Sequence, residues 1–204
     1  MRQSARSAAA SLTAAVLVSA CSILDPRPDP SRFFVLSPAP AADASAAGGG
    51  KLADLSVGLG PISVPDYANR PEIVVRNNAN EVQLEPVDRW AEPLSSNVSQ
   101  VLMQNLAQLL GTERVTLFPW YGTVPKYQVQ VDIVRFDQDD QRRATLIARW
   151  EIRDVVSKSI LAARQTDVTR PGTGDDTAAG VAALSATLAD LSRDIADAVR
   201  SQKR

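Results

Sequence analysis

The residue with the clearest possible chemistry is Cys21, the single cysteine of the 204-residue sequence. It follows Val18-Ser19-Ala20, after an apolar stretch from about residue 8 to residue 18 that is preceded by Arg2 and Arg6. A basic start, a short apolar stretch and small residues at the cleavage point are typical of an export signal. The stretch is too short for a membrane-spanning helix, which needs about 20 apolar residues. The sequence therefore predicts an exported chain with a thiol at its cleavage point.

This cysteine resembles the lipidated residue of a bacterial lipobox, where it becomes the first residue of the mature chain. The other interpretation is an ordinary secreted protein with a buried free thiol, but an unpaired cysteine in an exported protein calls for an explanation. A diacylglycerol and an N-acyl chain on Cys21 supply one, because several chains together give a stable anchor. Ser22 rather than aspartate follows, which by resemblance to sorted lipoproteins predicts the outer membrane, facing the periplasm. Apart from this covalent lipid, no cofactor is expected.

The composition argues against most enzyme chemistry. The sequence has no histidine, and after lipidation it has no free thiol, so the commonest general base, the usual zinc ligands and a cysteine nucleophile are missing. It contains no G-x-S-x-G, S-x-x-K, P-loop or G-x-G-x-x-G arrangement. Serine, aspartate and lysine chemistry stays open in principle, but we expect a protein that is not an enzyme and holds no metal. With 22 basic against 23 acidic residues and no basic block, nucleic acid is not an expected partner.

The chain divides into three expected parts. Residues 1–20 form the lipoprotein signal peptide, and residues 21–32 form the lipidated cysteine and a tether with Pro26, Pro28 and Pro30. Proline-rich segments are semi-rigid spacers, so the tether would hold the following domain away from the membrane surface. Residues 33–202 are expected to form a single domain.

Hydrophobic periodicity predicts the elements of that domain. One helix is expected between Pro93 and Gly111, and a second from about residue 176 or 177 to residue 200. Strands are expected at 33–36, 55–64, 73–76, 81–84, 115–118, 127–136, 143–154 and 159–165, with 73–84 forming a hairpin. This order predicts an α+β fold with a mixed, mainly antiparallel β-sheet and two packed α-helices, a two-layer sandwich.

Two acidic segments have a ligand-binding interpretation and a structural one. Asp137-x-Asp139-Asp140 lacks the glycine and distal glutamate of a calcium loop, so a solvated hairpin turn is the favoured interpretation. Gly172-x-Gly174-Asp175-Asp176 is best interpreted as a loop that ends in a helix N-cap. On the last helix, Asp190 is expected at a solvent-facing position.

Aromatic and charged residues in loops give the candidate partner-binding residues, because such residues are enriched at interfaces. The candidates are Tyr67, Arg70, Trp90, Glu92 and Trp120. Trp90 could equally pack against the first turn of the following helix, line a pocket or contact another copy of the chain. The apolar stripe of the last helix is likewise expected to pack on its own sheet, with self-association as the alternative.

A series of motifs in fixed order carries a resemblance to a known family. They are Arg32-Phe33-Phe34-Val35-Leu36, the segments 57–67, 69–74, 89–94 and 105–111, Pro119-Trp120, and 131–137. Together they resemble the PqiC-type family of ABC-type transport auxiliary lipoproteins over about residues 32–202. The resemblance implies a mixed sheet with two helices, and it carries over no catalytic residue.

The resemblance also implies a role and partners. Members work as outer-membrane lipoproteins beside an MCE-domain protein and associated ABC transporter subunits, in lipid transport and envelope integrity. A homo-oligomer would suit docking on such a partner. The alternative from another functional class is a periplasmic lipoprotein that binds a lipid or envelope ligand by itself.

Overall fold

The computed structural model describes residues 29–40 and 50–202. Ser31–Arg204 form one compact unit, and it is this unit that we describe. Cys21, the predicted signal peptide and all but the last residues of the predicted tether lie outside the described residues. The assignments made for them therefore stay predictions.

The described residues form one eight-stranded sheet, built around the long strand β6. The strands are β1 (Arg32–Phe34), β2 (Val57–Ser63), β3 (Glu72–Arg76), β4 (Val82–Trp90), β5 (Val115–Leu117), β6 (Tyr127–Asp139), β7 (Ala144–Asp154) and β8 (Ile160–Arg170). One edge of β6 pairs along its length with β7, which in turn pairs with β8. The other edge pairs first with β2 and then, near its end, with β3. Strand β6 thus joins two smaller groups of strands, β2–β5 and β3–β4–β1.

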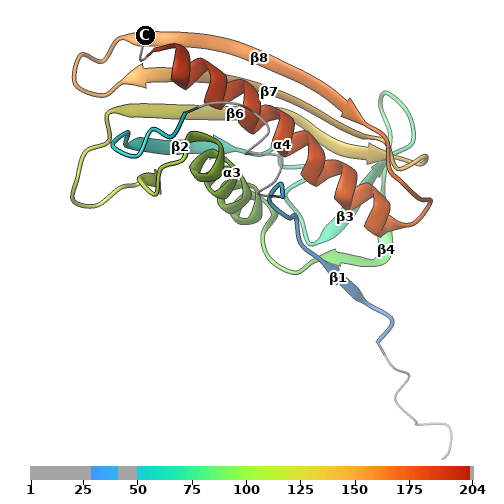
Figure 1. Cartoon of the computed structure of the whole chain (residues 1–204). Helices are drawn as coiled ribbons and strands as arrows, with labels where there is room; N and C mark the ends of the chain where they lie inside the picture. The colour runs from blue at the N-terminus through green and yellow to red at the C-terminus, as the bar shows by residue number, and fades with distance from the viewer. Residues whose placement is uncertain (1–28, 41–49, 203–204) are drawn as a thin grey trace, which may run out of the picture. The chain divides into compact units, whose positions relative to one another are not determined.

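The helices α3 (Leu94–Leu110) and α4 (Thr177–Ser201) lie side by side on the same face of this sheet (Figure 1). Four strand pairs are parallel, but the longest ladders, β6–β7 and β7–β8, are antiparallel. The predicted α+β class with a mixed, mainly antiparallel sheet and two packed helices is confirmed. No helix within the described ranges is long and apolar enough to span a membrane.

Strands β4 and β8 are longer than predicted, because pairing with neighbouring strands extends them. Strand β4 continues past Pro86 to Trp90, because the proline falls where the β3–β4 ladder shifts register between Leu84 and Arg89 and no bond is needed there. Strand β8 continues to Arg170, which pairs with Ala144. Paired neighbours, rather than the strand's own residues, set these ends.

The ends of both helices are fixed by identifiable caps. Pro93 occupies the N-cap position of α3 but has no side-chain oxygen to offer, and Asn69 Oδ1 instead accepts a hydrogen bond from the Ser95 N–H at 3.2 Å. Gly111 ends α3 in the left-handed conformation (φ 62°, ψ 40°), as predicted. Asp176 caps α4 by accepting from the Ala179 N–H at 2.9 Å, which confirms the N-cap interpretation.

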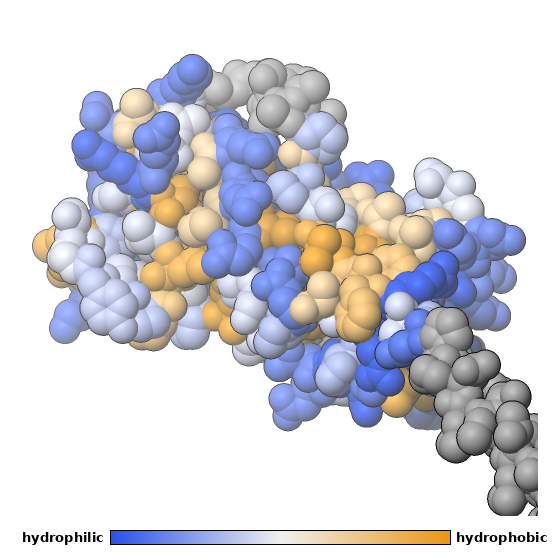
Figure 2. All heavy atoms as spheres, turned by 90° about the horizontal axis from the view of Figure 1, so that it is seen from below, coloured by the Kyte–Doolittle hydropathy of each residue, from blue (hydrophilic) through white to orange (hydrophobic). Residues whose placement is uncertain are grey.

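Apolar residues also reach the surface of the domain. Phe33, Val35, Val82, Leu84 and Phe118 are among the large apolar side chains that are exposed. Figure 2 shows one face of the molecule on which apolar residues gather in a band between hydrophilic margins. Such a surface is a candidate for contact with an apolar ligand or partner.

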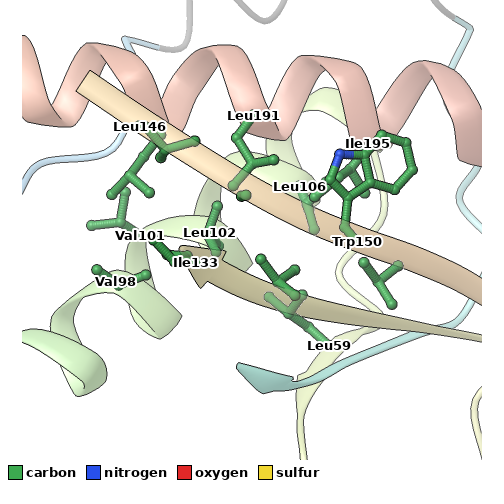
Figure 3. Close-up of a cluster of buried hydrophobic side chains, with 14 of the residues drawn as sticks. Leu59, Val98, Val101, Leu102, Leu106, Ile133, Leu146, Trp150, Leu191 and Ile195 are labelled. Carbon is green, nitrogen blue, oxygen red and sulfur yellow. The ribbon is translucent and has the colours of Figure 1, made fainter. Parts of the chain in front are cut away.

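The core lies between the two helices and the sheet (Figure 3). The stripe of α4 that was predicted to pack on its own sheet is buried: Val181, Leu184, Leu188, Leu191, Ile195 and Val199. Trp150 of β7 joins this core and donates its indole N–H to Thr166 Oγ1 at 3.0 Å. The helix stripe is therefore occupied within the domain.

Gly180 is required because α4 passes directly over the buried side chain of Gln138. A Cβ added at Gly180 would overlap the Gln138 amide, neither polar atom of which has a hydrogen-bond partner within the described part of the chain. We expect Gly180→Ala to lower the free energy of unfolding by about 1–3 kcal/mol. In a Gln138→Ala background the same change should be neutral, or stabilising by up to about 1 kcal/mol, since alanine favours helix.

Urea denaturation of the two single variants and the double variant measures this coupling. Gly174→Ala is the matched control, because a Cβ there would meet, among described atoms, only the Ala179 Cβ, at an ordinary contact distance of 3.4 Å. Equal effects of Gly180→Ala in both backgrounds would contradict the proposed overlap.

Candidate functional site

Three of the five predicted partner-binding residues line one surface depression. Arg70, Trp90 and Glu92 surround a hollow of about 420 Å³, together with Asn69, Pro71 and Pro93. We call it the docking depression. It lies where the loop between β2 and β3 meets the short turn between β4 and α3. Residues distant in sequence are thus brought together at the start of α3.

Backbone contacts set the positions of these side chains. The Trp90 N–H donates to the Pro71 carbonyl at 2.8 Å, which holds the end of β4 against the loop. The Trp90 side chain is only 7% exposed and belongs to the core, so packing is its main role. Arg70 and Glu92 are exposed at the rim. The depression therefore has a rigid aromatic wall and two accessible charges of opposite sign.

The rim charges differ in how they are held. Arg70 Nε bonds Glu72 Oε2 at 3.1 Å, and Arg89 reaches the other oxygen of Glu72 at 3.2 Å. The pKa of the Glu72 carboxyl is lowered by a hydrogen bond from its own backbone N–H and by Arg70. Glu92 has no ion pair among the described residues. It is the charge at this rim with most freedom to meet a partner.

Tyr67 lies on the same loop, but its side chain contacts β6 and does not line the docking depression. Its hydroxyl donates to Asp137 Oδ2 at 2.8 Å and accepts from the Phe136 N–H at 3.2 Å. Burial and the bond to Asp137 raise the pKa of the Tyr67 phenol. The loop is thus fastened to β6 by Tyr67 and to α3 by Asn69, which leaves the docking depression little freedom to change shape.

The interpretation of Asp137 as part of a solvated turn is wrong. Asp137 lies within β6, its side chain has no exposed surface, and it accepts from both Arg76 and Arg135. Arg76 Nε lies 2.9 Å from Oδ2, and Arg135 Nη2 lies 3.0 Å from Oδ1. We call these residues with Tyr67 the Asp137 network. Only the later part of the segment forms the turn, where Asp139 accepts from the Arg143 N–H at 2.9 Å.

Trp120 is separate from the docking depression. It lies in the loop between β5 and β6 and packs against β2, where a Cβ at Gly58 would come within 2.7 Å of its ring, so the glycine permits this close approach. Phe118 contacts it edge to face, with ring centroids 5.2 Å apart. The structure therefore does not place Trp120 in one site with Arg70, Trp90 and Glu92.

Asp190 was predicted at a solvent-facing position of the last helix, and this is wrong. Its residue is 7% exposed and its carboxylate bonds Arg170 Nε at 2.6 Å and Arg170 Nη2 at 2.7 Å. Arg193, one turn along α4, bonds the same carboxylate. Burial acts to raise the pKa of Asp190, but the two arginines outweigh it and the net shift is downward. The carboxylate stays charged and fixes both guanidinium groups.

One hollow on the sheet was not foreseen from the sequence. A trough of about 770 Å³ crosses β2, β6, β7 and β8 on the sheet face that does not carry the helices. Its side chains include Gln130, Asp132, Arg149, Glu151 and Gln165. In the sequence, this trough corresponds only to the polar positions of strands in which apolar and polar residues alternate. An ordinary solvent-exposed sheet face has the same pattern. Among the residues that the structure describes, no group of three or more acidic side chains could hold a metal ion.

The first strand is fastened where the predicted tether would reach the domain. Arg32 forms two bonds of 2.7 Å to Asp88, which is 2% exposed and lies on β4. The bond from Arg32, supported by Thr177 and Arg142, lowers the pKa of the Asp88 carboxyl. One carboxylate thus links β1, β4 and the start of α4.

Replacing Asp88 with asparagine tests this link through its pH dependence. Because the folded pKa is lowered, the stabilisation is present above the unfolded pKa of about 4 and is lost as the pH falls through the folded pKa. We expect Asp88→Asn to cost about 1–2 kcal/mol at pH 7, less than for a wholly buried pair because Arg32 is half exposed. The difference from the wild type should shrink below about pH 4 in urea unfolding. If Asp88→Asn lowered the free energy of unfolding by the same amount at pH 3 and at pH 7, the proposed contribution of the charged Asp88 carboxylate would be contradicted.

Solved structures share this fold. A protein described only as uncharacterized matches with a TM-score of 0.67 at 15% identity, covering 83% of this chain and 98% of its own. A Xanthomonas campestris protein of the DUF330 family matches with a TM-score of 0.65 at 18% identity, covering 84% of this chain and 98% of its own. At these identities the likeness shows the fold alone. Among curated proteins, none matches this chain.

A family described as the ABC-type transport auxiliary lipoprotein component matches residues 34–196. The match begins at the last residue of β1 and includes strands β2 to β8, α3, most of α4 and the docking depression. It agrees with the resemblance carried by the ordered motifs. The chain therefore belongs to the family of ABC-type transport auxiliary lipoprotein components.

Proposed function

We propose that this protein is an outer-membrane lipoprotein subunit of an MCE-type, ABC-linked lipid-transport system. It docks the periplasmic MCE-domain protein to the outer membrane and so supports envelope integrity. The observation that carries the proposal is the family match over residues 34–196, which makes the chain an auxiliary transport component. The lipobox ending at Cys21 supports the membrane position, with the domain facing the periplasm.

The docking depression is the surface that we assign to the partner. It combines a rigid aromatic wall with exposed charges, a combination that is enriched at interface anchors. It is held on two sides, by the Asp137 network and by the Asn69 contact to α3. A preformed surface loses little conformational entropy on binding, which favours association. The proposed role requires the protein to bind and position a partner, and it requires no covalent bond to be made or broken.

Reversing the free rim charge tests this surface without touching the core. Glu92→Lys is expected to weaken co-purification with the neighbouring MCE-domain protein by about tenfold or more, because like charges placed together at an interface are strongly unfavourable. Glu113→Lys is the matched control, since Glu113 is also exposed but lies after the other end of α3. It should leave co-purification unchanged.

The result for the wild type tests the proposed function, and the result for Glu92→Lys tests the proposed binding surface. The assay uses the lipidated chain extracted in mild detergent, with both proteins at micromolar concentration. Absence of any association of the wild type would overturn the proposed function. Association that survives Glu92→Lys would leave the function standing and show that another surface binds the partner.

A further inference from the structure

A second hollow runs along the outer side of α4. It has a volume of about 570 Å³ and lies between α4 and the segment 34–40. Its walls are apolar on both sides, with Phe34, Val35 and Pro38 facing Val181, Ala182 and Ala186. We call it the α4 groove. It is distinct from the docking depression, with which it shares no lining residue.

The segment that forms one wall is fixed to the helices. The Leu36 N–H donates to Asn97 Oδ1 at 2.6 Å, and the Ala39 N–H donates to Asn105 Oδ1 at 2.8 Å. The Ser37 N–H donates to Ser185 Oγ of α4 at 3.1 Å. The groove is therefore preformed, and these backbone donors are already used. An acyl chain needs no hydrogen-bond partner, whereas a bound peptide strand would.

Among the residues that the structure describes, Arg170 and Arg193 are the only charged ones that line the groove. Their side chains are 46% and 42% exposed, and Asp190 beneath them holds both in place. The three groups together carry a formal charge of +1, and each guanidinium has donors that Asp190 does not use. An arginine pair of this kind suits a phosphate, to which guanidinium groups form paired hydrogen bonds.

We propose that the α4 groove binds one acyl chain of a phospholipid, with the lipid phosphate at Arg170 and Arg193. The charge decides between possible occupants. The diacylglyceryl group expected on Cys21 has no phosphate, and a second copy of the chain would have to cover two half-exposed cations. The inference deepens the proposed function, on which its relevance to lipid transport rests. Phe34 is 13 residues from Cys21, so the groove would lie within about 45 Å of the anchored cysteine.

A fluorescent phosphatidylglycerol, added below its critical micelle concentration, tests the site. The full chain with Cys21→Ser is used, so that the chain's own lipid does not compete. We expect saturable binding that unlabelled phosphatidylglycerol displaces at least about tenfold better than diacylglycerol with the same acyl chains, because only the former has a phosphate.

Two variants separate the apolar and the charged parts. Ala182→Glu places a carboxylate in the apolar wall at an exposed helix position and should weaken binding about tenfold or more. Arg193→Gln should reduce the preference for phosphatidylglycerol over diacylglycerol, while Arg170 still satisfies Asp190. Gln100→Glu adds the same charge on an exposed position of α3 and is the control. Circular dichroism establishes that each variant is folded.

Absence of saturable binding, or equal binding by Ala182→Glu and the parent chain, would overturn the proposal. So would light scattering that shows Ala182→Glu to dissociate an oligomer while lipid binding is unchanged, since the groove would then be a protein interface. Lipid binding is measured without the MCE-domain protein, and the Glu92→Lys assay is measured without added lipid. A negative result for lipid binding therefore does not contradict the proposed docking function, and a negative result for docking does not contradict the proposed lipid site.

Discussion

Replacing Cys21 with alanine is expected to remove the protein from the membrane fraction and to abolish complementation of a deletion strain. A single acyl chain gives an association constant of only about 10⁴ M⁻¹, and stable anchoring requires more than one chain. If Cys21 carries the lipids as predicted, its loss removes every chain at once. Because the compact unit begins at Ser31, the fold itself should be unchanged.

Membrane fractionation, complementation and the thermal unfolding midpoint together measure this prediction. Ser22→Ala is the control, since it keeps the cysteine and should keep both location and function. Ser22→Asp is expected to shift the protein toward the inner membrane, by resemblance to sorted lipoproteins. If Cys21→Ala still fractionated with the outer membrane and complemented the deletion, the lipid anchor would not be essential.

Loss of the Asp137 carboxylate should have the largest effect on stability. Asp137→Asn keeps the shape but leaves Arg76 and Arg135 without their shared anion. Removing one partner of a buried ion pair is costly, although both arginines retain some contact with solvent here. We expect the free energy of unfolding to fall by about 2–4 kcal/mol.

Urea unfolding measures the change, with Asp140→Asn as the control because Asp140 is exposed in the adjoining turn. The control should lie within about 0.5 kcal/mol of the wild type. Tyr67→Phe removes one bond to the same carboxylate and should cost about 1 kcal/mol. In the Asp137→Asn background that cost should be smaller, because only the bond to Asp137 is shared by the two changes and the bond from the Phe136 N–H is lost in both backgrounds. An Asp137→Asn protein as stable as the control would show that the network does not stabilise the fold.

The same variant connects stability with the proposed docking. Tyr67 fastens the loop that carries Arg70 to β6 through Asp137. A looser loop would have to be ordered on binding, at a cost in affinity. Asp137→Asn is therefore expected to weaken co-purification with the partner even at temperatures where the protein stays folded.

The sequence by itself determined the features that depend on residues close together in the chain. The predicted export signal at Cys21, the helix between Pro93 and Gly111 and the alternation of β6 are local patterns, and for the helix and the strand the structure agrees. The order of motifs also identified the family, because an ordered series is specific even where each motif is weak.

Only the tertiary structure decided what depends on distant neighbours. Asp137 and Asp190 look like solvated acids in the sequence, but each is buried and pairs with an arginine from another strand, Arg76 of β3 and Arg170 of β8. Arg70, Trp90 and Glu92 share a depression while Trp120 does not, because the loop before β3 folds onto the start of α3. The α4 groove likewise needs segment 34–40 to lie on a helix almost 150 residues later in the chain. Burial and proximity of this kind are properties of the packed chain, and periodicity along the sequence carries no record of them.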